Sequence, residues 1–255
     1  MQRLILFDID CTLIDAHGAG GRAIFGAIKE VYGLQGELGN YNFHGRTDPG
    51  IIRDLTAMWG ADPVSTVSEF DRGTQPGVVI ALAARLGYSA EEIDSLLPAC
   101  LDRYVELIRE EVAAGHVEVL PGVDQLVRAL STDDRVLLGL LTGNVEEGAR
   151  VKLAPTGLLP HFALGAFGSD SPLRPDLPAV AVARAAALNG RRYTGKQVVV
   201  VGDTPADIEC GAQLGVRTVA VATGRYSVDE LAAHGPDRVF SDFSDWQAAL
   251  RAMVQ

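Results

Sequence analysis

The alternation of short apolar runs with helical segments in the second half of the chain constrains its fold most. Apolar runs predict strands at Val136–Leu141, Ala163–Phe167, Val198–Val201 and Val216–Val221. Around them, apolar residues at helical spacing predict helices near Val123–Leu130, Val145–Leu153, Leu177–Leu188 and Asp207–Leu214. A strand that is buried on both faces is apolar throughout, so this pattern predicts an α/β fold: a Rossmann-like parallel sheet with helices on both faces.

The N-terminal run Leu4–Phe7 predicts a further strand of this sheet, and two carboxylates, Asp8 and Asp10, follow it. Side chains at positions i and i+2 of a strand share a face, so these two charges repel each other unless a cation or a shared proton lies between them. Ligands of open α/β sheets bind at the carboxyl ends of the strands. A single Asp at this place would only indicate the start of a turn.

The segment after Asp15 has a helical pattern with no clear strand. Apolar spacing predicts four helices there, at Gly20–Tyr32, Asp48–Trp59, Gln75–Leu86 and Ala90–Val112. We therefore expect a helical domain inserted over residues 16–87, with residues 1–15 and 88–255 forming the α/β core. The second boundary falls within residues 88–115.

Composition narrows the classes of partner. The 255 residues are 47% hydrophobic, which is enough for a sizeable core. A net charge of −11 argues against nucleic acid, and no apolar stretch approaches the roughly 20 residues of a membrane span. The three scattered cysteines indicate reduced thiols. With no signal peptide at the N-terminus, we expect a cytoplasmic protein, monomeric or homodimeric.

Two further strand ends carry polar residues. Thr142, Gly143 and Asn144 follow one apolar run and form a plausible oxyanion-binding turn, although an ordinary turn with Asn144 as a helix N-cap is an alternative. Asp203 and Asp207 follow another run, and both could reach a cation at the sheet edge of Asp8. Such hard oxygen ligands suit Mg²⁺. Asp207 also favours a helix N-terminus electrostatically.

These motifs, taken in order, resemble those of the haloacid dehalogenase (HAD) superfamily. Asp8-Ile9-Asp10-Cys11-Thr12-Leu13 is similar to its first motif, whose usual form is Asp-x-Asp-Gly-Thr-Leu. Thr142 fits the second motif, Arg174 stands where the third has Lys, and Gly202–Asp207 fits the fourth. The helical insertion resembles the cap of phosphoglycolate phosphatase-like members.

The resemblance implies Mg²⁺-dependent phosphoryl transfer. Asp8 would be the nucleophile that forms an aspartyl-phosphate, and Asp10 the general acid and base. The metal would be held by Asp8, the main-chain carbonyl of Asp10 and Asp203, with Asp207 completing the shell. The phosphoryl oxygens would be held by Thr142 and by backbone N–H groups, namely those of Gly143, Asn144, Ile9, Asp10 and Cys11.

Two residues depart from the family pattern. Arg174 keeps the charge of the usual Lys with a different geometry and could bind two phosphate oxygens at once, the alternative being a solvated loop residue. We prefer Arg174 to Lys152, which lies within a helix, and to Lys196, which lies at the wrong end of a strand. Cys11 replaces a Gly, so we expect local strain or a shifted loop. Its thiol would be activated by a nearby cation or, as the simpler alternative, remain passive.

The inserted domain contributes one further candidate, Arg46, in the segment His44–Asp48. Arg46 could contact the phosphate or a remote acidic group of the substrate, whereas Thr47 or Asp48 could simply cap a helix. The expected function is a Mg²⁺-dependent phosphatase acting on a small phosphorylated metabolite. The alternatives are a sugar phosphomutase and a non-catalytic phosphate-binding protein of the same fold.

Overall fold

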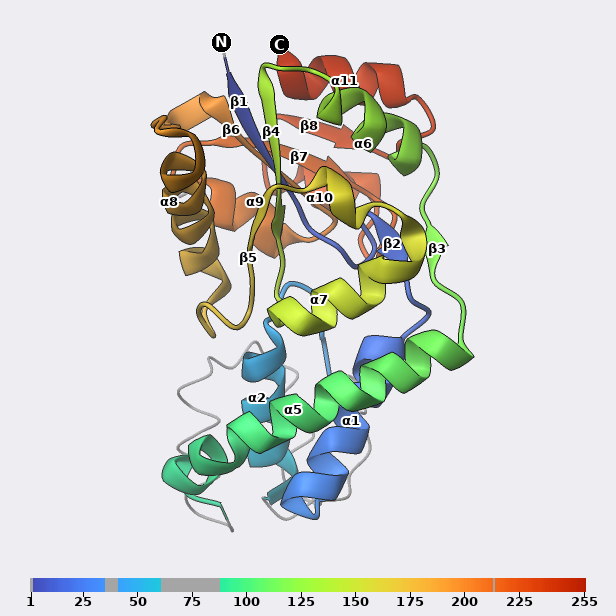
Figure 1. The fold of residues 1–255 in the computed structure, drawn as a ribbon, viewed down its shortest axis with the longest axis vertical. Coiled ribbons are helices and arrows are strands. Elements are labelled where there is room, and N and C mark those ends of the chain that lie inside the picture. Colours follow the sequence, from blue (N-terminus) through green and yellow to red (C-terminus); the bar gives the residue numbers. More distant parts are fainter. Residues whose placement is uncertain (1, 35–40, 61–87, 213) are drawn as a thin grey trace.

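The computed structural model describes residues 2–34, 41–60, 88–212 and 214–255 (Figure 1). The helix expected over Gln75–Leu86 lies outside these residues. Figure 1 shows a sheet with flanking helices at one end of the molecule and three helices, α1, α2 and α5, at the other. Both chain termini lie at the end that holds the sheet.

The sheet has six parallel strands in the order β5-β4-β1-β6-β7-β8. Their bounds are β1 Arg3–Phe7, β4 Val136–Leu141, β5 Leu164–Ala166, β6 Val198–Gly202, β7 Arg217–Val221 and β8 Arg238–Phe240. The predicted α/β parallel sheet is confirmed, and each of the five predicted strands is present. The edge strand β8 was not predicted.

Both faces of the sheet are covered because successive side chains of each strand point to opposite faces. Ile5 and Phe7 pack in one apolar cluster with helices α6 (Val123–Ser131) and α11 (Trp246–Val254). The alternate residues of β1 pack in a second cluster with helices α8 (Leu177–Asn189) and α9 (Pro205–Ala212). All five residues of β1 are buried, which explains the continuous apolar run Leu4–Phe7.

The three helices at the other end share an apolar cluster of their own. They are α1 (Ala19–Tyr32), α2 (Asp48–Gly60) and α5 (Ala90–Ala114). A capping box starts α5, in which the Ser89 side chain accepts from the Glu92 N–H and Glu92 accepts from the Ser89 N–H. Although the expected division placed residues from 88 onward in the core, α5 packs against α1 and α2.

A short antiparallel ribbon, not predicted from the sequence, lies where the chain passes between the two ends. Its strands are β2 (Ile14–Asp15) and β3 (Glu118–Val119). The remaining elements are α7 (Glu146–Leu153), α10 (Val228–Ala232), and the 3₁₀ turns η1 (Ala154–Thr156), η2 (Leu159–His161), η3 (Arg174–Asp176) and η4 (Gly195–Gln197). Among the described residues, every helix is too short or too polar to cross a bilayer.

Candidate active site

A cavity of about 380 Å³ lies between the carboxyl ends of the strands and the helical end of the molecule. The ends of β1, β4 and β6 supply Asp8, Thr142 and Asp203 to its wall. On the opposite side, the segment that leads into α2 supplies His44, and the first residue of α2 supplies the Asp48 side chain. The structure thus brings together the strand ends that the sequence singled out.

Three buried carboxylates, those of Asp8, Asp203 and Asp207, converge at this sheet edge. One oxygen of each lies within 4.8 Å of the others, and the residues are 6%, 1% and 1% exposed. Burial raises the pKa of Asp8 to about 6 and, together with the neighbouring carboxylates, raises that of Asp203 well above its usual value. The Oδ2 atom of Asp203 is buried without a hydrogen-bond partner. A hard divalent cation fits this donor set, because it would neutralise the charges and take the unpaired oxygen.

Arg174 lies beside this acidic group, in η3. Its Nη2 is 3.2 Å from Oδ2 of Asp8 and also pairs with Asp207. Burial lowers the pKa of Arg174, but the two carboxylates outweigh burial and raise it. The guanidinium therefore stays charged, and it offsets part of the negative charge around the expected nucleophile.

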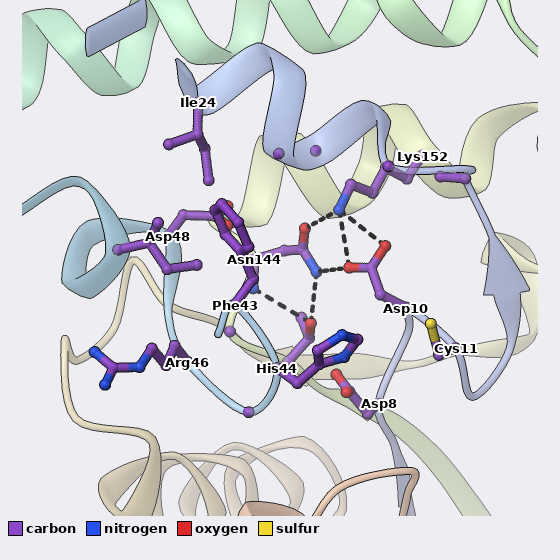
Figure 2. Close-up of a pocket in the computed structure, with 18 of the residues that line it drawn as sticks. Asp8, Asp10, Cys11, Ile24, Phe43, His44, Arg46, Asp48, Asn144 and Lys152 are labelled. Atoms are coloured by element: carbon purple, nitrogen blue, oxygen red, sulfur yellow. Dashed lines mark hydrogen bonds and ion pairs between the residues drawn. The ribbon is translucent and has the colours of Figure 1, made fainter. Parts of the chain in front are cut away.

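Lys152 was set aside in the sequence, yet the structure places it in the site. Its Nζ lies 3.0 and 2.8 Å from the two carboxylate oxygens of Asp10 and 2.7 Å from Oδ1 of Asn144 (Figure 2). The amide nitrogen of Asn144 donates to Asp10 at 2.7 Å. Lys152 is only 3% exposed. One signal was present: Lys152 follows Val145 and Ala149 at helical spacing, on the buried face of α7.

The pKa of Asp10 is shifted opposite to that of Asp8. Burial acts to raise it, but the charge of Lys152 and the hydrogen bonds from Lys152 and Asn144 outweigh burial and lower the pKa. The two carboxylates of the first motif thus have different electrostatic environments.

In the turn after β4, Thr142 and Asn144 are joined by hydrogen bonds. Thr142 Oγ1 accepts from the backbone N–H of Asn144 at 3.3 Å and from its side-chain amide at 2.8 Å. The alternative of Asn144 as a helix N-cap is wrong, because Val145 occupies the cap position. Gly143 has a steric role: a Cβ there would overlap the backbone carbonyl of Arg46.

Cys11 adopts a left-handed backbone conformation, with φ 57°. Its N–H donates to the carbonyl of Ile14 at 2.8 Å, so the prediction that this N–H holds a phosphoryl oxygen is wrong. The backbone N–H of Ile9 acts to lower the pKa of Asp8. Burial and nearby carboxylates, Asp203 first, raise the pKa of the Cys11 thiol to about 12, so without a cation this thiol is passive.

In the segment before α2, the side chain of Arg46 contacts other residues of the helical end. Its guanidinium pairs with Asp54 and lies 3.3 Å from the hydroxyl of Tyr41, and it points away from Asp8 and Asp10 (Figure 2). The structure therefore contradicts a phosphate contact by Arg46, which has a partner on α2.

The residues after Arg46 join α2 to the core. Thr47 caps α2, since its Oγ1 accepts from the Gly50 N–H at 3.2 Å. The carboxylate of Asp48 accepts from the Val145 N–H at 2.9 Å, and its own N–H donates to the Gly143 carbonyl at 2.8 Å. Burial raises the pKa of Asp48 to about 6.

Comparisons with known proteins agree with this geometry. A family described as HAD-hydrolase-like matches residues 178–246. A phosphoglycolate phosphatase of Rhodospirillum rubrum is 31% identical over 208 residues, which cover 78% of this chain and 84% of that protein. A probable phosphatase, IndB, of Dickeya dadantii is 25% identical over 262 residues, covering 100% and 96%. Among solved structures, a putative β-phosphoglucomutase from Bacteroides vulgatus has the same fold, with a TM-score of 0.63, 18% identity, and coverage of 100% and 91%.

Proposed function

The chain belongs to the haloacid dehalogenase-like hydrolase family as one of its phosphatases, and on that premise we propose that it hydrolyses a small phosphate monoester with Mg²⁺ through an aspartyl-phosphate on Asp8. The observation that carries the proposal is the environment of Asp8. It is buried beside Asp203 and Asp207, its carboxylate is 3.2 Å from Arg174, and it opens on the 380 Å³ cavity. Such a pocket-facing carboxylate beside a fixed cation suits attack on phosphorus.

In the first step, an oxygen of Asp8 attacks phosphorus in line with the ester oxygen, forming the Asp8–phosphorus bond as the ester bond breaks. Arg174 holds the other Asp8 oxygen and keeps the carboxylate oriented. The carboxylate must be ionised to attack. Burial raises its pKa to about 6, and the charge of Arg174 acts against burial and favours the ionised form.

Asp10 moves the protons in both steps. It gives a proton to the departing alcohol and takes one from the water that then hydrolyses the aspartyl-phosphate. Lys152 and Asn144 hold its carboxylate by short contacts and favour the ionised form, which accepts the proton from water. For the first step, Asp10 must bind a proton, which weakens its contact with Lys152.

Asp8, Asp203 and Asp207, together with the main-chain carbonyl of Asp10, would hold the Mg²⁺. The bound ion supplies charge neutralisation for the phosphoryl oxygens and the nucleophile. The unpaired Oδ2 of Asp203 supports this assignment. The three carboxylates would provide three protein ligands. Three suffice because Mg²⁺ keeps several water molecules as further ligands.

The helices α1, α2 and α5 form the cap in this proposal, with the boundary at the end of α5, inside the expected interval 88–115. The ribbon of β2 and β3 lies at both crossings and would act as the hinge. Closure would exclude water from the cavity, which favours phosphoryl transfer over side reactions. We retain the expectation of a cytoplasmic monomer or homodimer.

A phosphate-release screen with Mg²⁺ tests this proposal. The substrates are phosphoglycolate and panels of sugar, nucleotide and glycolytic phosphates. We expect release from at least one small monoester by the wild type, loss of release in Asp8→Asn, and full release in Asp124→Asn, whose carboxylate pairs with Arg128 on the exposed face of α6. Isomerised sugar phosphate without release would support the phosphomutase alternative. Turnover by Asp8→Asn at the wild-type rate would contradict the proposal.

A further inference from the structure

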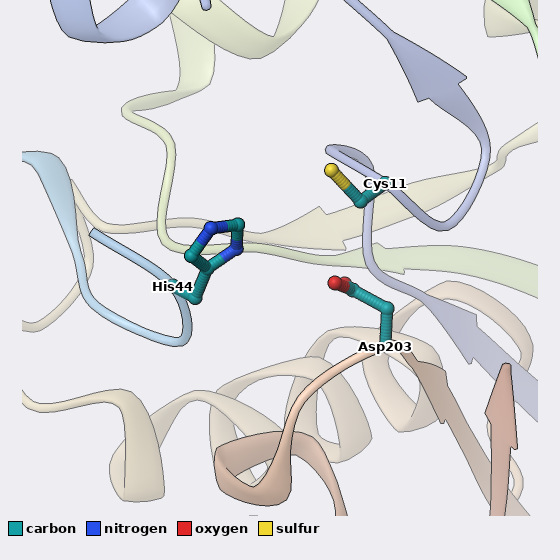
Figure 3. A group of neighbouring side chains, drawn as sticks. All are labelled: Cys11, His44 and Asp203. Atoms are coloured by element: carbon teal, nitrogen blue, oxygen red, sulfur yellow. The ribbon is translucent and has the colours of Figure 1, made fainter. Parts of the chain in front are cut away.

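A second cluster of metal-ligating side chains lies next to the acidic group. It consists of Cys11, His44 and Asp203, whose Sγ, ring nitrogen and carboxylate oxygen lie within 4.8 Å of one another. Figure 3 shows Cys11 and Asp203 projecting from the core toward the imidazole of His44. The three residues come from three separate segments: the loop after β1, the segment before α2 and the end of β6.

Among the described residues, the carboxylate of Asp203 forms no ion pair, although the charge of Arg174, which pairs with Asp8 and Asp207, acts on it. Asp203 is 1% exposed, and its Oδ2 has no hydrogen-bond partner. The carboxylates of Asp8, Asp10 and Asp15 surround the Cys11 thiol as well, so the local potential is negative. The imidazole of His44 faces both Cys11 and Asp203, and one of its ring nitrogens lies within reach of the same ion.

We propose that Cys11, His44 and Asp203 bind a borderline-soft divalent cation of the Zn²⁺ type. Mg²⁺ avoids sulfur and imidazole, whereas Zn²⁺ and Co²⁺ accept a thiolate, an imidazole and a carboxylate in one tetrahedral shell. Three protein ligands leave the fourth position open to the cavity, where a water or a substrate oxygen can bind. On binding, the Cys11 S–H bond breaks, its proton leaves to solvent, and the sulfur–metal bond forms.

The position of His44 gives the site a mechanical consequence. Cys11 and Asp203 belong to the core, while His44 belongs to the segment that leads into α2, so the bound cation ties this segment to the sheet edge. Asp203 is also one of the three proposed Mg²⁺ ligands. As far as the proposed function holds, the soft cation therefore withdraws Asp203 from the Mg²⁺ group and inhibits phosphate release.

Co²⁺ binding to the purified protein tests the site directly, because a thiolate ligand produces a sulfur-to-cobalt charge-transfer band that needs no enzyme activity. We expect this band in the wild type and in Cys100→Ala, whose thiol is buried among α1, α2 and α5. The band should vanish in Cys11→Gly and Cys11→Ser. His44→Ala should weaken Co²⁺ binding by at least about tenfold, and Zn²⁺ should displace the cobalt.

Inhibition by Zn²⁺ is measured separately. The wild type should lose phosphate release in Zn²⁺ and recover it with a chelator followed by Mg²⁺, whereas Cys11→Gly should be at least about tenfold less sensitive to Zn²⁺. Circular dichroism of each variant verifies its fold. Absence of the cobalt band in the wild type, or its persistence in a folded Cys11→Gly, overturns the site. A cobalt band in a wild-type protein that releases no phosphate from any substrate would overturn the proposed function but still support the soft-cation site.

Discussion

Lys152 is a buried cation whose short contacts all go to Asp10 and Asn144. A carboxylate that moves protons must be held at a fixed place, and a 3% exposed lysine on a helix does this rigidly. Within the described part of the chain, its removal leaves Asn144 as the side chain that holds the Asp10 carboxylate. The residue therefore positions the proposed acid and base rather than contacting the phosphoryl group.

We expect Lys152→Met to lower kcat by about 100-fold with a smaller change in KM, because the positioning of a general acid and base is lost. Lys196→Met removes a surface pair with Asp237 and should leave kcat unchanged. Lys152→Arg keeps the charge and should restore part of the activity. Equal kcat values for Lys152→Met and the wild type would remove Lys152 from the site.

Cys11 occupies a backbone conformation that costs an L-residue free energy. With φ 57°, Cys11→Gly relieves this strain, and we expect the free energy of unfolding to rise by about 1 kcal/mol in urea titrations of the metal-free protein. The same change at Cys100, in helix α5, should instead destabilise the protein, since Gly is unfavourable in a helix. A less stable Cys11→Gly would show that thiol packing outweighs the strain.

At the scale of elements, the contact between the β4–α7 turn and the start of α2 joins the two ends of the molecule. The Gly143 carbonyl accepts from the Asp48 N–H, and the Arg46 carbonyl lies where a Cβ of residue 143 would be. We expect Gly143→Ala to destabilise the protein by about 1–3 kcal/mol and to reduce activity, measured by urea unfolding and phosphate release. Gly21→Ala, which adds a Cβ in ordinary contact distance on α1, is the matched control. Wild-type stability in Gly143→Ala would contradict this contact.

The sequence predicted the elements whose pattern is local and strong. The apolar strands β1, β4, β6 and β7 were predicted because a buried strand is apolar along its whole length. The two-residue strands β2 and β3 are too short to carry a pattern, and they form by pairing with each other from distant parts of the chain. The edge strand β8 has three residues, as does β5, but β5 lies within the longer apolar run Ala163–Phe167.

In the candidate site, the residues that directly follow predicted strands were predicted, and those in other elements were not. Asp8 and Asp203 follow strong strands, so their meeting could be inferred from the parallel topology. Lys152 and His44 lie in other elements and reach the site only through tertiary packing. Arg46 was expected at the phosphate because no local signal shows that Asp54, two turns along α2, takes its charge.

For the molecule as a whole, the buried Asp48 couples the docking of the helical end to pH. The pKa of its carboxyl is about 6 in the folded protein, raised by burial from 3.8. As pH rises from 4 to 6, the unfolded chain has already lost this proton while the folded protein still holds it. Stability therefore falls over this window and stays lower above it.

Asp48→Asn removes this titration. We expect the free energy of unfolding of the wild type to fall relative to that of Asp48→Asn between pH 4 and pH 7, by about 3 kcal/mol at most. Urea unfolding at several pH values measures both free energies of unfolding. The contributions of the other titrating groups cancel in the difference between the two proteins. A difference that is constant with pH, or that grows in the opposite direction, would show that Asp48 is ionised throughout.

The central claim for the whole enzyme is that Asp8 carries the phosphoryl group between the two steps. The direct measurement is acid quenching of the wild type during turnover with Mg²⁺, followed by peptide mapping by mass spectrometry. The account predicts a phosphoryl group on Asp8 in the peptide that spans β1 and the following loop, and none in Asp8→Asn. Steady phosphate release without any phosphorylated Asp8 at any quench time, or turnover by Asp8→Asn, would contradict it.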